Sequence, residues 1–151
     1  PSQISQVALN LVVNAAQAYA GKQDQHGAAQ GKITIRTGID DADPSRIWFE
    51  VADAGCGIPA EHLSRIFDPF FTTKPVGQGT GLGLSVSYGI VNAHHGQISV
   101  TSTVGAGTTF RVTLPVDAAE ESPQPGKTEP VVAHASAPDA RTQSTLASTG
   151  R

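Results

Sequence analysis

The sequence is poor in charged residues, aromatic residues and cysteine. Charged residues make up 15% and aromatic residues 5% of its 151 positions, and the formal net charge is −3. This balance offers no basic surface for nucleic acid or for an anionic membrane. The single cysteine, Cys56, excludes an internal disulfide framework and a zinc site made of several cysteines.

Long apolar runs and an N-terminal signal segment are also missing. No run approaches the ~20 apolar residues that span a bilayer, and residues 1–5 lack the basic stretch and apolar core of a secretion signal. We therefore expect a cytoplasmic setting without direct membrane contact. Because position 1 is proline rather than methionine, we expect the sequence to be a fragment of a longer chain.

The composition changes at residue 117. Residues 117–151 hold seven alanines, four prolines, four serines and four threonines, and no aromatic residue. Such a segment buries too little apolar surface to offset the entropy lost on ordering it. We predict one folded domain over residues 1–116 and a disordered linker or tail over residues 117–151.

Hydrophobic periodicity and turn residues predict helices and strands throughout the folded part. The predicted elements are a helix over 2–20, strands over 33–37 and 47–51, a short helix over 59–65, a helix over 82–94, and strands over 97–102 and 108–115. A polar loop over 21–31 and an irregular loop over 67–81 connect them. The apolar face of the helix over 82–94 is expected at Leu82, Val86, Ile90 and Ala93. Two hairpin-like strand pairs beside helices predict an α+β or α/β sandwich with helices on one sheet face.

The first predicted helix carries a stripe of carboxamide side chains. The stripe consists of Gln3, Gln6, Asn10, Asn14 and Gln17. At ~100° per residue these positions fall within roughly 80° of one another, on one face of the helix. A solvated face normally carries Lys and Glu, and a carboxamide oxygen is a suitable neutral ligand for Mg²⁺. A face turned toward a ligand and an ordinary solvated face both remain open at this point.

A carboxylate followed by two glycines comes after the second predicted strand. Alternation along that strand puts Asp53 on the same side as Val51, and a buried carboxylate needs a donor. An adenine amine would be such a donor, and Gly55 and Gly57 leave room for a flat group to approach the backbone. The alternative is an Asp that caps the following short helix, but it lies too far ahead of Pro59 to be the N-cap.

The loop before the second long helix is dense in glycine. Four of the seven residues from Gly77 to Gly83 are glycine, and they lead into a helix N-terminus. Backbone amides and the helix dipole favour a phosphate at such a place, and Lys74 is a nearby cation. Three of the five phenylalanines also lie in this loop, which suits a lid that is anchored at one end and mobile at the other. The pattern is not a P-loop, because no Gly-Lys-Ser/Thr occurs.

Five short motifs follow one another over residues 1–116. They are residues 6–15 (QVALNLVVNA), 53–59 (DAGCGIP), 67–71 (FDPFF), 79–84 (GTGLGL) and 105–110 (GAGTTF). In this order they resemble the N, G1, F and G2 boxes and the closing glycine–threonine turn of the catalytic ATP-binding domain of sensor histidine kinases. This domain belongs to the wider group of gyrase, Hsp90 and mismatch-repair ATPases. Residues 71–74, with a short lid, are similar to the nitrogen-regulation type of these kinases.

The resemblance implies a Bergerat-type fold, in which a mixed and mostly antiparallel sheet is covered on one face by helices. Domains of this family usually begin with a strand ahead of the first helix, so the resemblance implies an N-terminally truncated domain. It is also compatible with the cytoplasmic part of a membrane sensor. The tail would lead to a receiver domain, as in hybrid kinases, or be a frayed terminus.

The resemblance implies ATP and Mg²⁺ as cofactors and gives roles to particular residues. Asn14 would hold Mg²⁺ against the triphosphate with Asn10 close by, and Asp53 would accept from the adenine amine with Thr108 and a water beside it. The residues implied to take part in catalysis are Asn10, Asn14 and Lys74. The residues implied to line the nucleotide site are Asn14, Gln17, Asp53, Gly55, Gly57, Ile58, Phe71, Lys74, Gly79, Thr80, Gly81, Leu82, Gly83, Leu84 and Thr108.

The residue type at position 10, an asparagine, distinguishes between a kinase and an ATPase. The ATPases of this group carry a water-activating Glu one helical turn before the metal-binding Asn, and a carboxamide cannot take a proton at neutral pH. We therefore expect transfer of the γ-phosphate to a histidine on an upstream dimerisation domain, which would also form the dimer, and then to a response-regulator receiver domain. The alternatives are a non-catalytic nucleotide-binding or interaction module and an ATPase of the same group. No nucleic-acid partner is expected.

Overall fold

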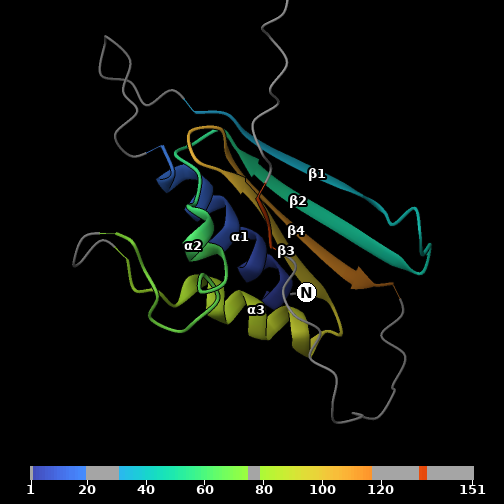
Figure 1. Ribbon diagram of the computed structural model, residues 1–151. Helices are drawn as coiled ribbons and strands as arrows, with labels where there is room; N and C mark the ends of the chain where they lie inside the picture. Colours follow the sequence, from blue (N-terminus) through green and yellow to red (C-terminus); the bar gives the residue numbers. More distant parts are fainter. Residues whose placement is uncertain (1, 20–30, 75–78, 117–132, 136–151) are drawn as a thin grey trace, which may run out of the picture.

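The computed structural model describes residues 2–19, 31–74, 79–116 and 133–135 (Figure 1). It contains three helices and five strands within these ranges. In chain order they are α1 (Ser2–Gln17), β1 (Ile33–Ile39), β2 (Arg46–Asp53), α2 (Ala60–Leu63), α3 (Gly83–Ala93), β3 (Gln97–Thr103), β4 (Gly107–Pro115) and β5 (Ala133–Ala135). No helix among the described residues is long and apolar enough to span a bilayer.

The strands form one sheet in the order β1-β2-β4-β3-β5. Two antiparallel hairpins, β1–β2 and β3–β4, are joined through an antiparallel pairing of β2 with β4. In the first hairpin, the side chains of Asp40 and Asp43 accept backbone hydrogen bonds inside the turn. The second hairpin turns at Gly105, whose φ of +82° lies in the left-handed region that glycine adopts readily.

The register brings three strand ends together at one edge of the molecule. Asp53, the last residue of β2, lies opposite Thr108 of β4, and Thr108 in turn lies opposite Ser102 of β3. In a pleated sheet, directly opposite residues share a face. These three polar side chains therefore form a row on the side of the sheet that faces the helices.

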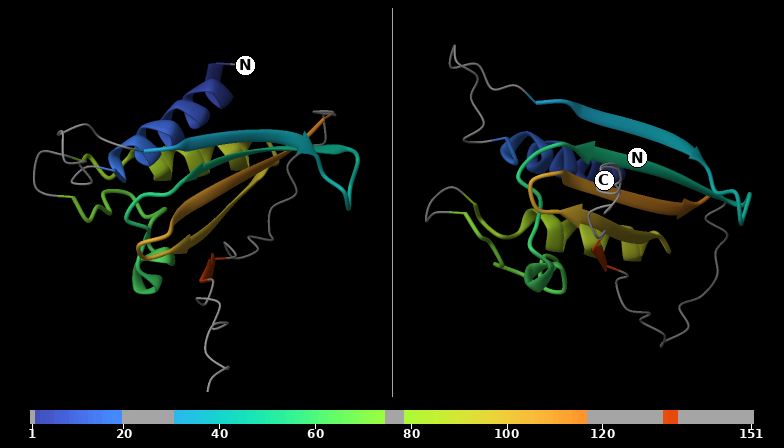
Figure 2. Two further views of the ribbon diagram at one scale, coloured as in Figure 1. Left: turned by 90° about the horizontal axis from the view of Figure 1, so that it is seen from above. Right: turned by 45° about the horizontal axis from the view of Figure 1, so that its top comes forward.

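The helices α1 and α3 lie on one side of the sheet, which gives two layers (Figure 2). This arrangement confirms the predicted α+β sandwich with a mostly antiparallel sheet and helices on one face. The predicted elements correspond to observed ones, although α1 ends at Gln17 rather than at residue 20. The predicted loop over residues 21–31 lies almost entirely outside the described residues.

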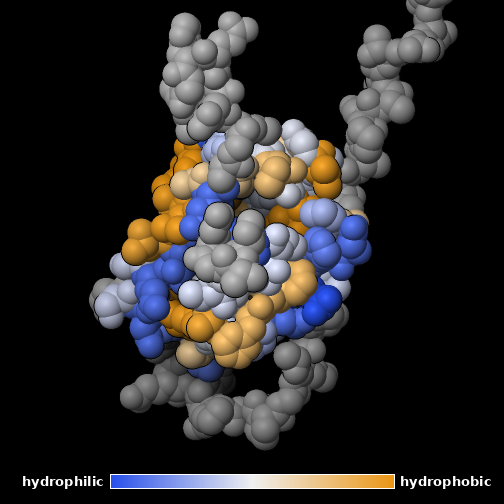
Figure 3. Space-filling model, turned by 90° about the vertical axis from the view of Figure 1, so that its left-hand side faces the viewer, coloured by the Kyte–Doolittle hydropathy of each residue, from blue (hydrophilic) through white to orange (hydrophobic). Residues whose placement is uncertain are grey.

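The apolar face predicted for α3 is wrong at three of its four positions: Ile90 packs on the core, whereas Ala93 is exposed. Leu82 and Val86 are 37% and 40% exposed, and the fully buried positions of the helix are Ser87 and Val91. Hydrophobic residues accordingly lie on the surface as well as in the core, and one side of the molecule mixes hydrophobic and hydrophilic residues (Figure 3). The reason is that the side of α3 that carries Ser87 faces α1, where Ser87 Oγ accepts from Asn10 Nδ2 at 3.2 Å.

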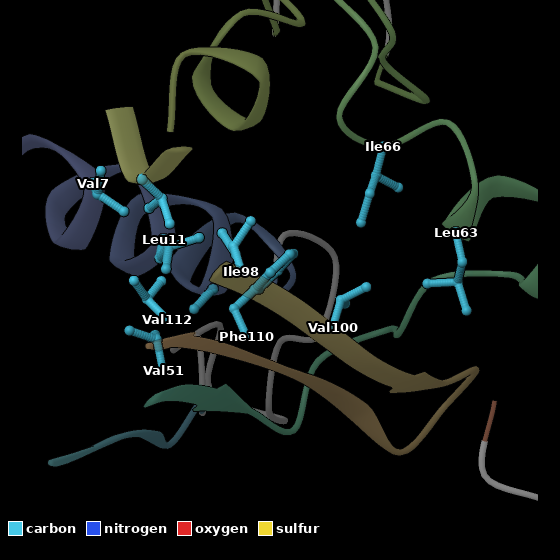
Figure 4. Close-up of a cluster of buried hydrophobic side chains, with 11 residues drawn as sticks. Val7, Leu11, Val51, Leu63, Ile66, Ile98, Val100, Phe110 and Val112 are labelled. Atoms are coloured by element: carbon cyan, nitrogen blue, oxygen red, sulfur yellow. The ribbon is translucent and has the colours of Figure 1, made fainter. Parts of the chain in front are cut away.

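The core lies between the helices and the sheet. Val7 and Leu11 of α1 point toward the strands, and side chains of β2, β3 and β4 point toward them (Figure 4). Ala15 of α1 belongs to the same buried cluster. The buried strand residues are Val51, Ile98, Val100, Phe110 and Val112. Spacings of three and four on the helix and of two on the strands produce these two matching apolar faces.

The chain after residue 116 contributes one described element that the sequence did not predict. Strand β5 pairs in parallel with β3, with Val100 opposite Ala133. An edge strand such as β3 has backbone groups that can accept a further strand. The rest of the predicted linker, residues 117–132 and 136–151, lies outside the described residues, so its predicted disorder stays a prediction.

Candidate functional site

Asp53 ends β2 on the face that the helices cover, as the alternation predicts. It is partly buried, and its Oδ1 accepts a hydrogen bond from the backbone N–H of Gly55 at 2.8 Å. This short-range bond turns the chain out of the strand into the loop that follows. The carboxylate is therefore held in place by its own loop at the edge where β2 and β4 end.

The two glycines after Asp53 are packed against protein backbone. A Cβ on Gly55 would lie 2.5 Å from the Cβ of Ala18, and a Cβ on Gly57 would lie 2.1 Å from the carbonyl oxygen of Thr103. Gly57 also has a φ of +72°. Close packing thus accounts for the absence of side chains at both positions, and their predicted contact with a purine stays a prediction.

A hydroxyl pair connects the sheet edge to the loop after Asp53. Ser102 Oγ and Thr108 Oγ1 are 2.9 Å apart, and both residues are buried. Ser102 Oγ also donates to the Gly107 carbonyl and accepts from the N–H of Ile58. Ile58 packs on the core. The structure therefore places Thr108 opposite Asp53 and connects Ile58 to Thr108 through Ser102, so that these predicted site residues belong to one network.

Tyr19 joins three segments through its hydroxyl group. The residue is 6% exposed and follows the end of α1. Its hydroxyl donates to the carbonyl of Lys32 at 2.6 Å and accepts from the N–H groups of Lys32 at 3.0 Å and Ala54 at 2.7 Å. One donor and two lone pairs are thus all used. Sequence reasoning missed this role, because only the fold brings residues 19, 32 and 54 together.

We expect Tyr19→Phe to lower the free energy of unfolding by about 1–3 kcal/mol. The substitution leaves the N–H groups of Lys32 and Ala54 without their acceptor in a partly buried place. Urea denaturation followed by circular dichroism measures the change. Tyr88→Phe is the matched control: the Tyr88 ring packs on Phe67, and we expect a change below about 0.5 kcal/mol. Equal losses in both variants would contradict this role of Tyr19.

The glycine-dense loop leads into α3 as predicted, with residues 75–78 outside the described part. Gly81 has a φ of +67°, and its carbonyl accepts from the N–H of Phe70 at 3.0 Å. The Oγ1 of Thr80 accepts from the N–H of Leu82 at 3.3 Å. The N-cap residue of α3 is Leu82, whose side chain makes no capping hydrogen bond. The first-turn amides and the helix dipole therefore favour an anion at this end.

Lys74 reaches from this loop to the end of α1. Its ammonium group donates to the side-chain oxygen of Gln17, so two predicted site residues meet. A Cβ on Gly79 would lie 3.1 Å from the Lys74 side chain. Partial burial lowers the pKa of Lys74 below its ordinary value of 10.5, and an electrostatic interaction with Cys56 opposes this shift. Lys74 is thus a partly desolvated cation at the mouth of the site.

The phenylalanines of the loop behave differently from one another. The ring of Phe71 lies 5.6 Å from the ring of His62, and the guanidinium of Arg65 lies 4.8 Å above it. Phe67 packs on Tyr88 with ring centroids 5.4 Å apart. These two rings anchor the segment to α2 and α3. Phe70, in contrast, is 74% exposed and has a φ of +66°.

The carboxamide stripe of α1 divides into parts with different surroundings. Asn10 Nδ2 donates to Gly83 O and to Ser87 Oγ, and Gln17 accepts from Lys74. Asn14 is partly buried, one helical turn after Asn10. Gln3 and Gln6 are exposed. The stripe is therefore neither wholly solvated nor wholly turned to a ligand.

The donor chemistry of α1 suits Mg²⁺. Asn10 and Asn14 offer neutral carboxamide oxygens on one helix face, and Mg²⁺ takes few protein oxygens when substrate phosphates complete its shell. Within the described ranges no cluster of three His, Cys, Asp or Glu side chains could hold a metal. An ion at this place would thus need phosphate oxygens from a ligand as well.

Comparison with known proteins identifies relatives of this chain and of its fold. A family model described as "Histidine kinase-, DNA gyrase B-, and HSP90-like ATPase" matches residues 1–118. Sensor kinase CckA of Brucella abortus (strain 2308) is 47% identical over 125 residues, which cover 75% of this chain and 12% of that kinase. The nucleotide-free catalytic domain of histidine kinase ThkA superposes with a TM-score of 0.60 at 36% identity, covering 76% of this chain and 66% of that one. Full-length ShkA, solved in complex with AMPPNP, matches with a TM-score of 0.59 at 28% identity over 75% of this chain and 21% of that one.

Proposed function

The chain belongs to the histidine kinase-, DNA gyrase B- and HSP90-like ATPase family, and we propose that it binds ATP with Mg²⁺ and donates the γ-phosphate to a histidine on a dimerisation domain. One observation carries this proposal: α1 and the residue that follows it contact three of the four other segments of the predicted site. Asn10 bonds to Gly83 of α3, Gln17 to Lys74, and the carbonyl of Ala18 to the N–H of Cys56.

In the proposed complex the base lies beside the last turn of α1, and the triphosphate extends from there toward the N-terminus of α3. Asp53 accepts from the adenine amine, beside Thr108, near the last turn of the helix. Lys74 and the amides of Gly79, Thr80, Gly81 and Leu82 face the phosphates. Gly83 and Leu84 continue this surface into α3, and Phe71 supports the loop. The structure of full-length ShkA in complex with AMPPNP supports nucleotide binding as the function to propose for this chain.

Asn14, with Asn10 beside it, would hold Mg²⁺, which would neutralise charge on the triphosphate. The chain's own contribution to transfer is then positioning and charge neutralisation, which phosphoryl transfer needs more than covalent help. Asn10 points its amino group at two acceptors on α3. A carboxamide so engaged is no base for water, which favours transfer over hydrolysis.

Exposed apolar side chains beside the phosphate end suit a partner domain. Phe70 is 74%, Leu82 37% and Val86 40% exposed. The backbone connects them, because the N–H of Phe70 bonds to Gly81 and the N–H of Val86 bonds to Leu82. We propose that the helical dimerisation domain that carries the histidine docks here, and that a response-regulator receiver domain later accepts the phosphate. The nitrogen-regulation subtype stays a prediction.

Nucleotide binding by the purified chain tests the proposal. Calorimetry should detect ATP binding that tightens at least about tenfold on adding Mg²⁺, and Asn14→Ala should lose this effect because the carboxamide ligand is gone. Gln3→Ala, which removes an exposed carboxamide from the same helix, is the matched control and should behave like the parent. Undiminished Mg²⁺ dependence in Asn14→Ala would contradict the proposed metal site.

A second measurement separates the catalytic alternatives. The chain is incubated with γ-labelled ATP, with and without a histidine-bearing dimerisation domain of a related sensor kinase. Acid-labile, base-stable label on that domain supports the kinase. Hydrolysis by the chain alone that Asn10→Ala abolishes would favour an ATPase. Bound ATP with neither reaction would favour a non-catalytic module.

The lowered pKa of Lys74 predicts a pH dependence of ATP binding. The free chain loses the Lys74 proton at a lower pH than an ordinary lysine would, whereas bound phosphates favour the charged form. Binding therefore takes up a proton once the pH is high enough for the free chain to lose it, and affinity should fall as pH rises toward the ordinary lysine pKa of 10.5. Lys74→Arg, which stays charged, should flatten the profile, whereas Lys32→Arg, outside the site, should not.

A further inference from the structure

Asn10 is held by α3 through its carboxamide nitrogen. Nδ2 donates to the carbonyl of Gly83 and to Ser87 Oγ, each at 3.2 Å. A backbone carbonyl is only an acceptor, so the amino end of this carboxamide must face α3. The oxygen, Oδ1, lies at the other end of the same planar group. It is therefore the atom that Asn10 presents away from α3.

Ser87 is the less expected partner in this arrangement. Its side chain is 0% exposed, in the middle of α3. Alanine would fit there as a better helix former without a polar atom to satisfy. The Ser87 hydroxyl donates to Gly83 O at 2.8 Å, so a lone pair is left to accept from Asn10. Because the Ser87 hydroxyl is oriented by its bond to the Gly83 carbonyl, its free lone pair fixes the direction from which Asn10 Nδ2 donates.

We propose that Ser87 is a positioning residue that orients Asn10 toward the metal–triphosphate part of the site. The inference rests on the proposed function, since it assigns a use to Oδ1 of Asn10 beside Asn14. Ser87 is fully buried, and its hydroxyl bonds to Asn10 and Gly83, so any effect on the site passes through Asn10. Without its hydroxyl, Asn10 keeps one acceptor, Gly83 O, and its carboxamide is less restricted about its side-chain torsions.

The first test compares ATP affinity with and without Mg²⁺. Ser87→Ala should weaken binding of Mg²⁺·ATP about 3- to 10-fold, the range that corresponds to one net hydrogen bond. Binding of ATP without the metal should not change. A merely structural role would lower both affinities together. Ser87→Cys, with a weak sulfur acceptor of similar shape, should lie between the parent and the alanine variant and serves if the alanine variant fails to fold.

A double-mutant cycle tests whether Ser87 acts through Asn10. In the Asn10→Ala background, Ser87→Ala should cause no further loss of Mg²⁺·ATP affinity. Ser85→Ala is the matched control: its hydroxyl also donates to a carbonyl of the same helix end, that of Leu82, and its removal should leave the affinity unchanged. Additive losses in the double variant would overturn the inference.

A third measurement, on the chain without nucleotide, tests the contact between Ser87 and Asn10 directly. In the free chain, nuclear magnetic resonance should resolve two slowly exchanging side-chain amide hydrogens of Asn10, and Ser87→Ala should speed the exchange of one of them. No difference between parent and variant would overturn the proposed contact. If the parent binds no Mg²⁺·ATP, the proposed function fails, and this inference with it. If the parent binds and only the Ser87 variants are unaffected, the inference alone fails.

Discussion

Replacing Asp53 by alanine is expected to weaken ATP binding by about 10- to 100-fold. A hydrogen bond to a charged group contributes about 1.5–3 kcal/mol, and each 1.4 kcal/mol corresponds to a factor of ten in affinity. The carboxylate of Asp53 is held at the end of β2 by its bond from Gly55 N–H. It is the one acidic side chain among the residues proposed to line the site. Calorimetric titration with ATP measures the effect.

Two further variants separate the loss of adenine recognition from a general effect of removing a carboxylate or of disturbing the fold. Asp43→Ala removes a carboxylate from the turn at the other end of β1 and β2, and ATP affinity should be unchanged. In Asp53→Asn the side-chain oxygen can still accept from the N–H of Gly55. Its amino group would then face the adenine amine, and two hydrogen-bond donors repel each other. We expect it to bind ATP as weakly as the alanine variant and to lose less affinity for GTP, whose guanine carbonyl is an acceptor. ATP binding by Asp53→Asn at the parent level would contradict the assigned role.

The parts of the site that follow from local regularity could be predicted from the sequence. Strand alternation placed Asp53 on the face of Val51, and β2 is regular through Asp53. Helical spacing placed Asn10 and Asn14 on one face of α1. The order of the motifs along the chain indicated the fold, which the sheet order and the helical layer confirm.

The parts that depend on contacts distant in sequence could not be predicted. Nearly all residues of α3 are apolar or small, so periodicity could not determine which side faces the core, and Ser87 was missed. Tyr19 meets Ala54 across 35 positions, and only the fold creates that contact. Serine at an inward position of β3, in line with Ile98 and Val100, was a signal for Ser102 that the sequence did contain.

Gly107→Ala is expected to lower the free energy of unfolding by about 3–5 kcal/mol or to prevent folding, because a left-handed residue and overpacking each cost about 1–3 kcal/mol. Gly107 has a φ of +118°, and an added Cβ would lie 2.0 Å from the carbonyl oxygen of Asp53 and 2.7 Å from the Cα of Ala54. Both neighbours are backbone, so neither can move away as a flexible side chain would. Urea denaturation measures the loss.

Gly105 is a matched control for the conformational part of this cost. Its φ is +82°, but an added Cβ would meet nothing within 4 Å. Gly105→Ala should therefore cost only about 1–2 kcal/mol, and the difference between the two variants isolates the contact with Asp53. If Gly107→Ala folds, the shifted backbone of Asp53 should also weaken ATP binding, while Gly105→Ala should leave binding unchanged. Equal losses of stability would mean that backbone torsion alone requires glycine at 107, and that Asp53 is positioned without it.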